Sequence, residues 1–125
     1  MKKNLRIMVI DDENIVGKRL KPALEKQGDV VETFTDARKA LERFGEQQFD
    51  IVVSDIRMDD IDGLEVLEQV LARSERTKVI IITGYATVEV AQEALVKGAF
   101  DFIAKPFKPN DLRAIIEKAA KELDS

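Results

Sequence analysis

Five side chains that could take part in acid, metal or charge chemistry each follow a short apolar run of the chain. They comprise three carboxylates, one hydroxyl and one ammonium group: Asp11, Asp12, Asp55, Thr83 and Lys105. Three neighbouring carboxylates repel one another strongly unless a cation compensates them. An oxygen-only donor set favours a hard ion, Mg²⁺ or Mn²⁺. These residue types predict metal-assisted chemistry on an anionic group, provided that the fold brings them together.

Each of these residues also has an ordinary structural interpretation when it is considered alone. Asp12 and Glu13 suit helix capping, and an aspartate such as Asp55 is common in turns. Thr83 also suits a turn, and a lysine such as Lys105 is most often exposed to solvent. The recurrence of such residues directly after separate apolar runs is what favours a shared site.

The elements that must position these residues alternate between strand and helix. Runs of β-branched and aliphatic residues predict strands over 7–10, 30–34, 51–54, 79–82 and 100–103, each followed by helical spacing of apolar residues. Asp36 is a predicted N-cap, and Pro109 is a predicted first helical position. Gly28, Gly45 and Gly98 are predicted helix ends, because glycine readily adopts the left-handed conformation.

Uninterrupted alternation of strand and helix predicts an α/β domain with a parallel sheet covered on both faces. We expect a doubly wound five-stranded sheet of order 2-1-3-4-5 with five helices, in which the first and third strands are neighbours. The strands then all point the same way, so their carboxyl ends lie at one edge of the sheet. Asp11, Asp12 and Asp55 are expected to meet there, with Thr83 and Lys105 on the far side of Asp55.

Asp55 is the predicted nucleophile, because it lies between the expected metal side and the Lys105 side. A metal ion, an ammonium and a hydroxyl around a carboxylate can stabilise the charge of a transferring phosphoryl group. The expected product is an acyl phosphate on Asp55.

The composition narrows the classes of function. The 125 residues suffice for one domain, and 45% hydrophobic with 35% charged residues is typical of a globular protein. The chain has no cysteine and no histidine, which removes thiolate chemistry and a histidine base within it. A net charge of −4 argues against direct nucleic-acid binding, and the apolar runs are too short to span a membrane. We expect a cytoplasmic protein with one domain over residues 1–125 and no output domain in the chain.

Four motifs, in order, resemble the receiver domain of two-component response regulators. They are IDDE at 10–13, SDIRM at 54–58, ITGYA at 82–86 and FIAKPF at 102–107. The resemblance extends from about Leu5 to Leu123, and residues 98–107 are most similar to receivers of sigma-54-type, nitrogen-regulation-like activators. It implies the flavodoxin-like receiver fold.

The resemblance implies a signalling phosphoacceptor and not an enzyme, although the domain would assist its own phosphotransfer and autodephosphorylation. A sensor histidine kinase or a phosphotransfer protein would supply the phosphoryl group to Asp55 with Mg²⁺ bound. The implied metal ligands are Asp12, Asp55 and the backbone carbonyl of Arg57, with Asp11 acting directly or through water. Thr83 and Lys105 would contact the phosphoryl oxygens.

A switch and a cis peptide bond are also implied. The bond between Lys105 and Pro106 would be cis. Thr83 would move toward the phosphate and Phe102 would turn inward, acting by packing alone because phenylalanine has no hydroxyl. The face formed by the fourth helix, fifth strand and fifth helix would then control an output domain or target protein, with transcription as the expected output. A phosphorylation-dependent homodimer is left open.

Two departures from the family's pattern affect the expected reaction. Asp59 stands where the family often has proline, so the loop after Asp55 is expected to be less constrained. The resemblance implies that Arg57 and Tyr85 occupy the positions that flank the phosphoryl group and tune its hydrolysis in the family, and neither residue can orient an attacking water as a carboxylate or carboxamide would. We therefore predict a long-lived acyl phosphate.

Three other functions fit the sequence less well. A haloacid-dehalogenase-like phosphatase would use Asp11 as its nucleophile, but it needs a late acidic pair where this chain has residues 105–107. A receiver-like binding module that is not phosphorylated would not need the intact acidic set with Thr83 and Lys105. A flavodoxin-type flavin carrier would need a hydroxyl- and glycine-rich phosphate loop after the first strand.

Overall fold

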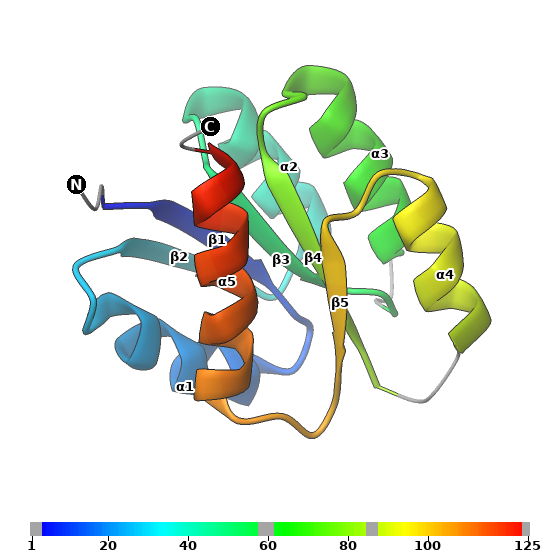
Figure 1. Cartoon of the computed structure of the whole chain (residues 1–125). Coiled ribbons are helices and arrows are strands. Elements are labelled where there is room, and N and C mark those ends of the chain that lie inside the picture. Colours follow the sequence, from blue (N-terminus) through cyan, green and yellow to red (C-terminus); the bar gives the residue numbers. More distant parts are fainter. Residues whose placement is uncertain (1–3, 58–61, 85–87, 124–125) are drawn as a thin grey trace.

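The computed structural model describes residues 4–57, 62–84 and 88–123, in which strands and helices alternate. The strands are β1 (Arg6–Ile10), β2 (Val30–Phe34), β3 (Ile51–Asp55), β4 (Lys78–Thr83) and β5 (Asp101–Ala104). The helices are α1 (Asn14–Glu25), α2 (Ala37–Glu46), α3 (Gly63–Arg73), α4 (Val88–Val96) and α5 (Pro109–Leu123). The strands form one parallel sheet of order β2-β1-β3-β4-β5 (Figure 1), which confirms the predicted topology.

The core lies on both faces of the three central strands, whose side chains alternate between the faces. Ile7 and Val9 of β1 pack on the face covered by α1 and α5, together with Leu20 and Leu112. Met8 and Ile10 belong to the other face, which α2, α3 and α4 cover (Figure 1). Continuous burial of β3 from Ile51 to Asp55 explains why this strand shows no polar alternation. The site at the end of β3 is therefore carried by a fully buried strand.

Four of the five helix ends predicted from the sequence are confirmed by the structure, and one is not. The Asp36 side chain caps α2, and Pro109 is the first residue of α5. Gly28 and Gly98 follow α1 and α4 with positive φ angles of 90° and 113°. The prediction that Gly45 ends a helix is wrong, because Gly45 lies inside α2 and the helix ends one residue later, where the chain becomes extended.

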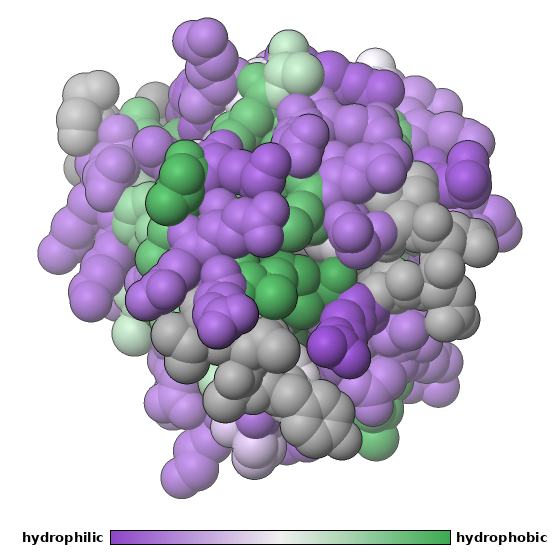
Figure 2. All heavy atoms as spheres, turned by 90° about the vertical axis from the view of Figure 1, so that its right-hand side faces the viewer, coloured by the Kyte–Doolittle hydropathy of each residue, from purple (hydrophilic) through white to green (hydrophobic). Residues whose placement is uncertain are grey.

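The surface on the α4 side of the molecule is mostly hydrophilic, with hydrophobic side chains gathered near its centre (Figure 2). Two large apolar residues of α4, Leu95 and Val96, are exposed. Among the described residues, no helix is long and apolar enough to cross a membrane.

Candidate functional site

Three carboxylates meet at the carboxyl edge of the sheet. Asp11 directly follows β1, and Asp55 is the last residue of β3, the strand beside it. Each of Asp11, Asp12 and Asp55 offers a carboxylate oxygen, and these oxygens all lie within 4.8 Å of one another. Asp11 and Asp55 are buried, whereas Asp12 is exposed. The strand order thus brings together acidic residues that lie 44 positions apart in the chain, as predicted.

Backbone amides orient one oxygen of each buried carboxylate. The Glu13 amide donates to Asp11 Oδ1 at 2.8 Å, and the Arg57 amide donates to Asp55 Oδ1 at 3.2 Å. The second oxygens, Oδ2 of Asp11 and Oδ2 of Asp55, both lie near Lys105 Nζ. Asp11 Oδ2 is buried and has no well-aligned hydrogen-bond partner among the described residues. Its charged neighbour is Lys105 Nζ at 2.9 Å, and three carboxylates gather around this ammonium, so the donor set suits a hard divalent cation as well.

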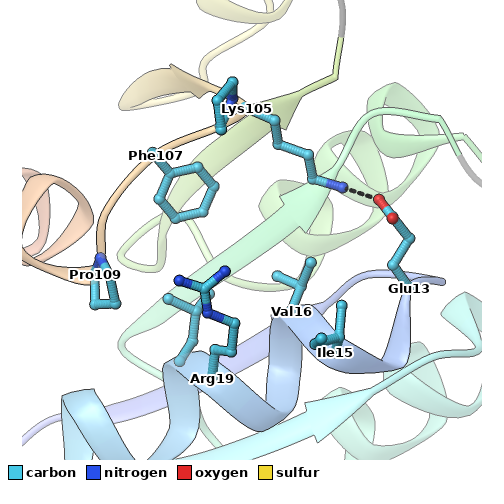
Figure 3. A pocket seen from close by; sticks show the side chains of 9 residues that line it. Glu13, Ile15, Val16, Arg19, Lys105, Phe107 and Pro109 are labelled. Atoms are coloured by element: carbon cyan, nitrogen blue, oxygen red, sulfur yellow. Dashed lines mark hydrogen bonds and ion pairs between the residues drawn. The ribbon is translucent and has the colours of Figure 1, made fainter.

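Lys105 brings its ammonium group into the same cluster from the end of β5. Its Nζ lies 2.6 Å from Glu13 Oε1 (Figure 3), 2.9 Å from Asp11 Oδ2 and 3.3 Å from Asp55 Oδ2. The Lys105 amide donates to the Thr83 carbonyl at 2.7 Å, which extends the pairing of β4 and β5 to the site. The peptide bond between Lys105 and Pro106 is cis.

The charges of this cluster shift the pKa values of three side chains. Burial raises the pKa of Asp11, and the Glu13 amide and the nearby Lys105 only partly oppose this effect. Burial would lower the pKa of Lys105, but its hydrogen bond to Glu13 and its contacts with Asp11 and Asp55 outweigh burial and raise it. The same hydrogen bond lowers the pKa of Glu13. Lys105 is therefore kept in its charged form, whereas burial disfavours the charged form of Asp11.

An open cleft of about 540 Å³ lies over the cluster. Its described lining residues are Asp12, Glu13, Asp55, Arg57, Gly84, Lys105 and Pro106. A cleft of this size admits a phosphoryl group together with part of the molecule that donates it. Asp55 is thus both buried at its base and open to a ligand at its carboxylate.

Thr83 and Phe102 lie in the adjoining strands. Thr83 is buried at the end of β4, one residue after Ile82, which pairs with Asp55. Phe102 in β5 is half-buried and packs against the core beneath α2, α3 and α4. These positions are compatible with the predicted switch, which stays a prediction.

Two residues that contribute to the site were not singled out by sequence reasoning. Glu13, considered there only as a helix cap, makes no cap hydrogen bond and instead pairs with Lys105. Gly63 begins α3 against the chain that leaves β3, where an added Cβ would lie 2.5 Å from the Asp55 carbonyl oxygen. The acidic loop at Met58, Asp59 and Asp60, and the flanking Tyr85, fall outside the described residues.

Comparison with known proteins identifies relatives over most of the chain. Residues 7–117 match the response regulator receiver domain family. The chain is 40% identical to regulatory protein AtoC of Escherichia coli K12 over 114 residues, which is 91% of this chain and 25% of AtoC. It is 37% identical to transcriptional regulatory protein FixJ of Bradyrhizobium diazoefficiens over 118 residues, which is 94% of this chain and 58% of FixJ. The chain therefore spans only part of the length of these regulators.

Solved structures agree over the whole fold. A CheY-like response regulator receiver domain protein of Methanospirillum hungatei superposes with a TM-score of 0.92 at 31% identity, covering 98% of both chains. The beryllofluoride-activated receiver domain dimer of NtrC4 gives a TM-score of 0.89 at 33% identity, covering 94% of this chain and 98% of that one. The AtoC and NtrC4 matches confirm the predicted similarity to receivers of nitrogen-regulation-like activators. The chain belongs to the family of response regulator receiver domains, the phosphoacceptor domains of two-component signalling systems.

Proposed function

We propose that Asp55 accepts a phosphoryl group from the phosphohistidine of a sensor histidine kinase or a phosphotransfer protein. The observation that carries this proposal is the meeting of three carboxylates and the Lys105 ammonium beneath one open cleft. An aspartate that only forms a turn or caps a helix would not need other carboxylates and an ammonium group beside it. A site that binds a divalent cation and a phosphoryl group does need these charges.

The reaction is a transfer from nitrogen to oxygen. A carboxylate oxygen of Asp55 attacks the phosphorus atom, the phosphorus–nitrogen bond breaks, and its electron pair stays on the leaving imidazole. Lys105 neutralises the charge on the phosphoryl oxygens, and the Thr83 hydroxyl donates to one of them. The backbone amides of Glu13 and Arg57 keep Asp11 and Asp55 oriented, which lowers the reorganisation needed during transfer.

Mg²⁺, or Mn²⁺ in its place, is the proposed cofactor. The residues that would hold it are Asp11, Asp12, Asp55 and the backbone carbonyl of Arg57. Bound there, the ion would neutralise charge on the carboxylates and on the transferring group. Asp11, Asp12 and Asp55 bring three carboxylates together beside the Lys105 ammonium, and this excess of negative charge supports the assignment.

Phosphorylation is proposed to act on the face formed by α4, β5 and α5. Movement of Thr83 toward the phosphate would let Phe102 turn inward and change the packing of this face. Leu95 and Val96 of α4 are exposed and offer apolar side chains to a partner. We propose a cytoplasmic domain whose target is an output domain or partner that controls transcription, with a phosphorylation-dependent homodimer as one arrangement. The transcriptional regulator FixJ and the NtrC4 dimer support this view by similarity.

Labelling with acetyl phosphate tests the proposal without a kinase. Wild-type protein is expected to acquire the label in the presence of Mg²⁺, and Asp55→Asn to acquire none. Asp36→Asn is the matched control, because asparagine caps α2 as well as aspartate does and the residue lies outside the cluster. Label that persists in Asp55→Asn and disappears in Asp11→Asn would instead support the phosphatase alternative.

A further inference from the structure

Glu13 makes the shortest contact of the Lys105 ammonium group. Its Oε1 lies 2.6 Å from Lys105 Nζ, whereas Asp11 Oδ2 lies at 2.9 Å and Asp55 Oδ2 at 3.3 Å. Glu13 occupies the N-cap position of α1, yet its side chain caps no amide there. The position of its carboxylate is therefore explained by Lys105 and not by the helix.

The ammonium group has three N–H donors, and three carboxylates already surround it. A phosphoryl group on Asp55 adds oxygens that require a donor from Lys105, so one existing contact must weaken. The Asp11 side chain is only 1% exposed and cannot be rehydrated if Lys105 leaves it, whereas the Glu13 side chain is 62% exposed. Water can replace Lys105 at Glu13 at little cost, so of these two contacts the one with Glu13 is the easier to break.

The Glu13–Lys105 pair also lies at the boundary between two hollows. Both residues line the cleft over Asp55, and both line a neighbouring pocket of about 230 Å³ that α1 and the segment after β5 form (Figure 3). Ile15 and Phe107 belong to that pocket alone. The Glu13 contact thus draws the Lys105 ammonium group toward α1, while Lys105 Nζ still lies 3.3 Å from Asp55 Oδ2.

We propose that Glu13 is a positioning residue that competes with the incoming phosphoryl group for Lys105 and so limits phosphorylation of Asp55. This inference rests on the proposed phosphoacceptor function. The role belongs to the Glu13 side chain, whose carboxylate pairs with Lys105, whereas the Glu13 backbone amide donates to Asp11 Oδ1 whatever side chain stands at position 13.

The test measures the rate at which Asp55 is labelled by acetyl phosphate at fixed Mg²⁺ and ionic strength. In this reaction Asp55 attacks phosphorus and acetate leaves. Glu13→Gln keeps the side-chain length but removes the charge, and Glu13→Asp keeps the charge but shortens the reach to Lys105. Glu25→Gln makes the same change of charge on an exposed residue at the far end of α1, roughly 18 Å from Glu13 along the helix.

Glu13→Gln is expected to be labelled about two- to five-fold faster than wild type, the range that an exposed ion pair supports. The labelling rate of Glu13→Asp should lie between those of Glu13→Gln and wild type, and the labelling rate of Glu25→Gln should equal that of wild type. Equal rates for Glu13→Gln and wild type would overturn the inference. The inference would also be overturned if Glu13→Gln were labelled faster than wild type while Glu13→Asp were labelled at the wild-type rate. Net charge alone would then explain the effect, without any need for reach to Lys105. Wild-type protein that takes no label at Asp55 would refute the proposed function itself, which is a separate outcome.

Discussion

Gly63 sets how closely α3 approaches the chain that carries Asp55. Its amide donates to the Ile56 carbonyl at 2.8 Å, and the residue is buried. A Cβ at this position would lie 2.5 Å from the Asp55 carbonyl oxygen and 2.6 Å from Ile56 Cα, both of which are backbone atoms. We therefore predict that Gly63→Ala destabilises the domain and displaces Asp55.

The expected size of the effect follows from these contacts. Ordinary contact for a Cβ begins at 3.4 Å, so α3 and the backbone after β3 must separate by about 0.9 Å. Overpacking of this kind costs about 1–3 kcal/mol. For a domain of this length, about 4 °C of Tm per kcal/mol gives a decrease of about 4–12 °C. Labelling of Asp55 by acetyl phosphate should also slow, because the carboxylate moves relative to Lys105.

Thermal unfolding followed by circular dichroism, with Gly84→Ala as the matched control, provides the assay. A Cβ on Gly84 would meet no atom within 4 Å among those described, so the same substitution there adds no clash. Gly84→Ala should change stability by no more than about 1 kcal/mol, in the stabilising direction if at all. Equal Tm values for the two variants would refute the argument that Gly63 is required by close backbone contact.

Three further predictions concern charge. Arg43 hydrogen-bonds Glu32 and lowers its pKa below the ordinary 4.5, so the pair stabilises the fold above that pH and the contribution is lost as pH falls through the lowered value. The Tm advantage of wild type over Glu32→Gln should accordingly shrink between pH 6 and roughly pH 3. Added Mg²⁺ should raise the Tm of wild type but not that of Asp11→Asn, because the variant lacks one proposed metal ligand. Without divalent ions at pH 7, Asp11→Asn should have the higher Tm, because burial raises the pKa of Asp11 and so disfavours its charged form in the folded protein. The acyl phosphate of wild type should outlive that of Arg57→Asn several-fold in a label-decay assay, because an amide can orient an attacking water; faster decay in wild type would contradict this.

Much of the fold could be predicted because the chain's local and global signals agree. The apolar run from Val79 to Ile82 has no polar alternation and is buried in β4 as expected. Parallel strands all end at one edge of the sheet, so the strand order alone predicted that Asp11 and Asp55 would lie close together, as they do. Pro109 marked the start of α5 because its missing amide hydrogen is not needed there.

The errors and omissions have equally physical causes. Gly45 looked like a helix end, but a glycine ends a helix only where the chain takes a positive φ, and Gly45 stays helical within α2. The partner of Glu13 lies 92 residues away, so no local pattern could separate an ion pair from a cap. The close approach at Gly63 likewise depends on how α3 settles against β3, which spacing along the chain does not encode.

Asp55 is proposed to accept phosphate temporarily, in a reaction that depends on a divalent ion. Mass spectrometry of peptides from protein treated with acetyl phosphate, with Mg²⁺ or with excess EDTA, tests it most directly. We predict one modification, located at Asp55, that forms with Mg²⁺ and fails to form with EDTA. A modification located at another residue, or one that forms equally well in EDTA, would contradict the account.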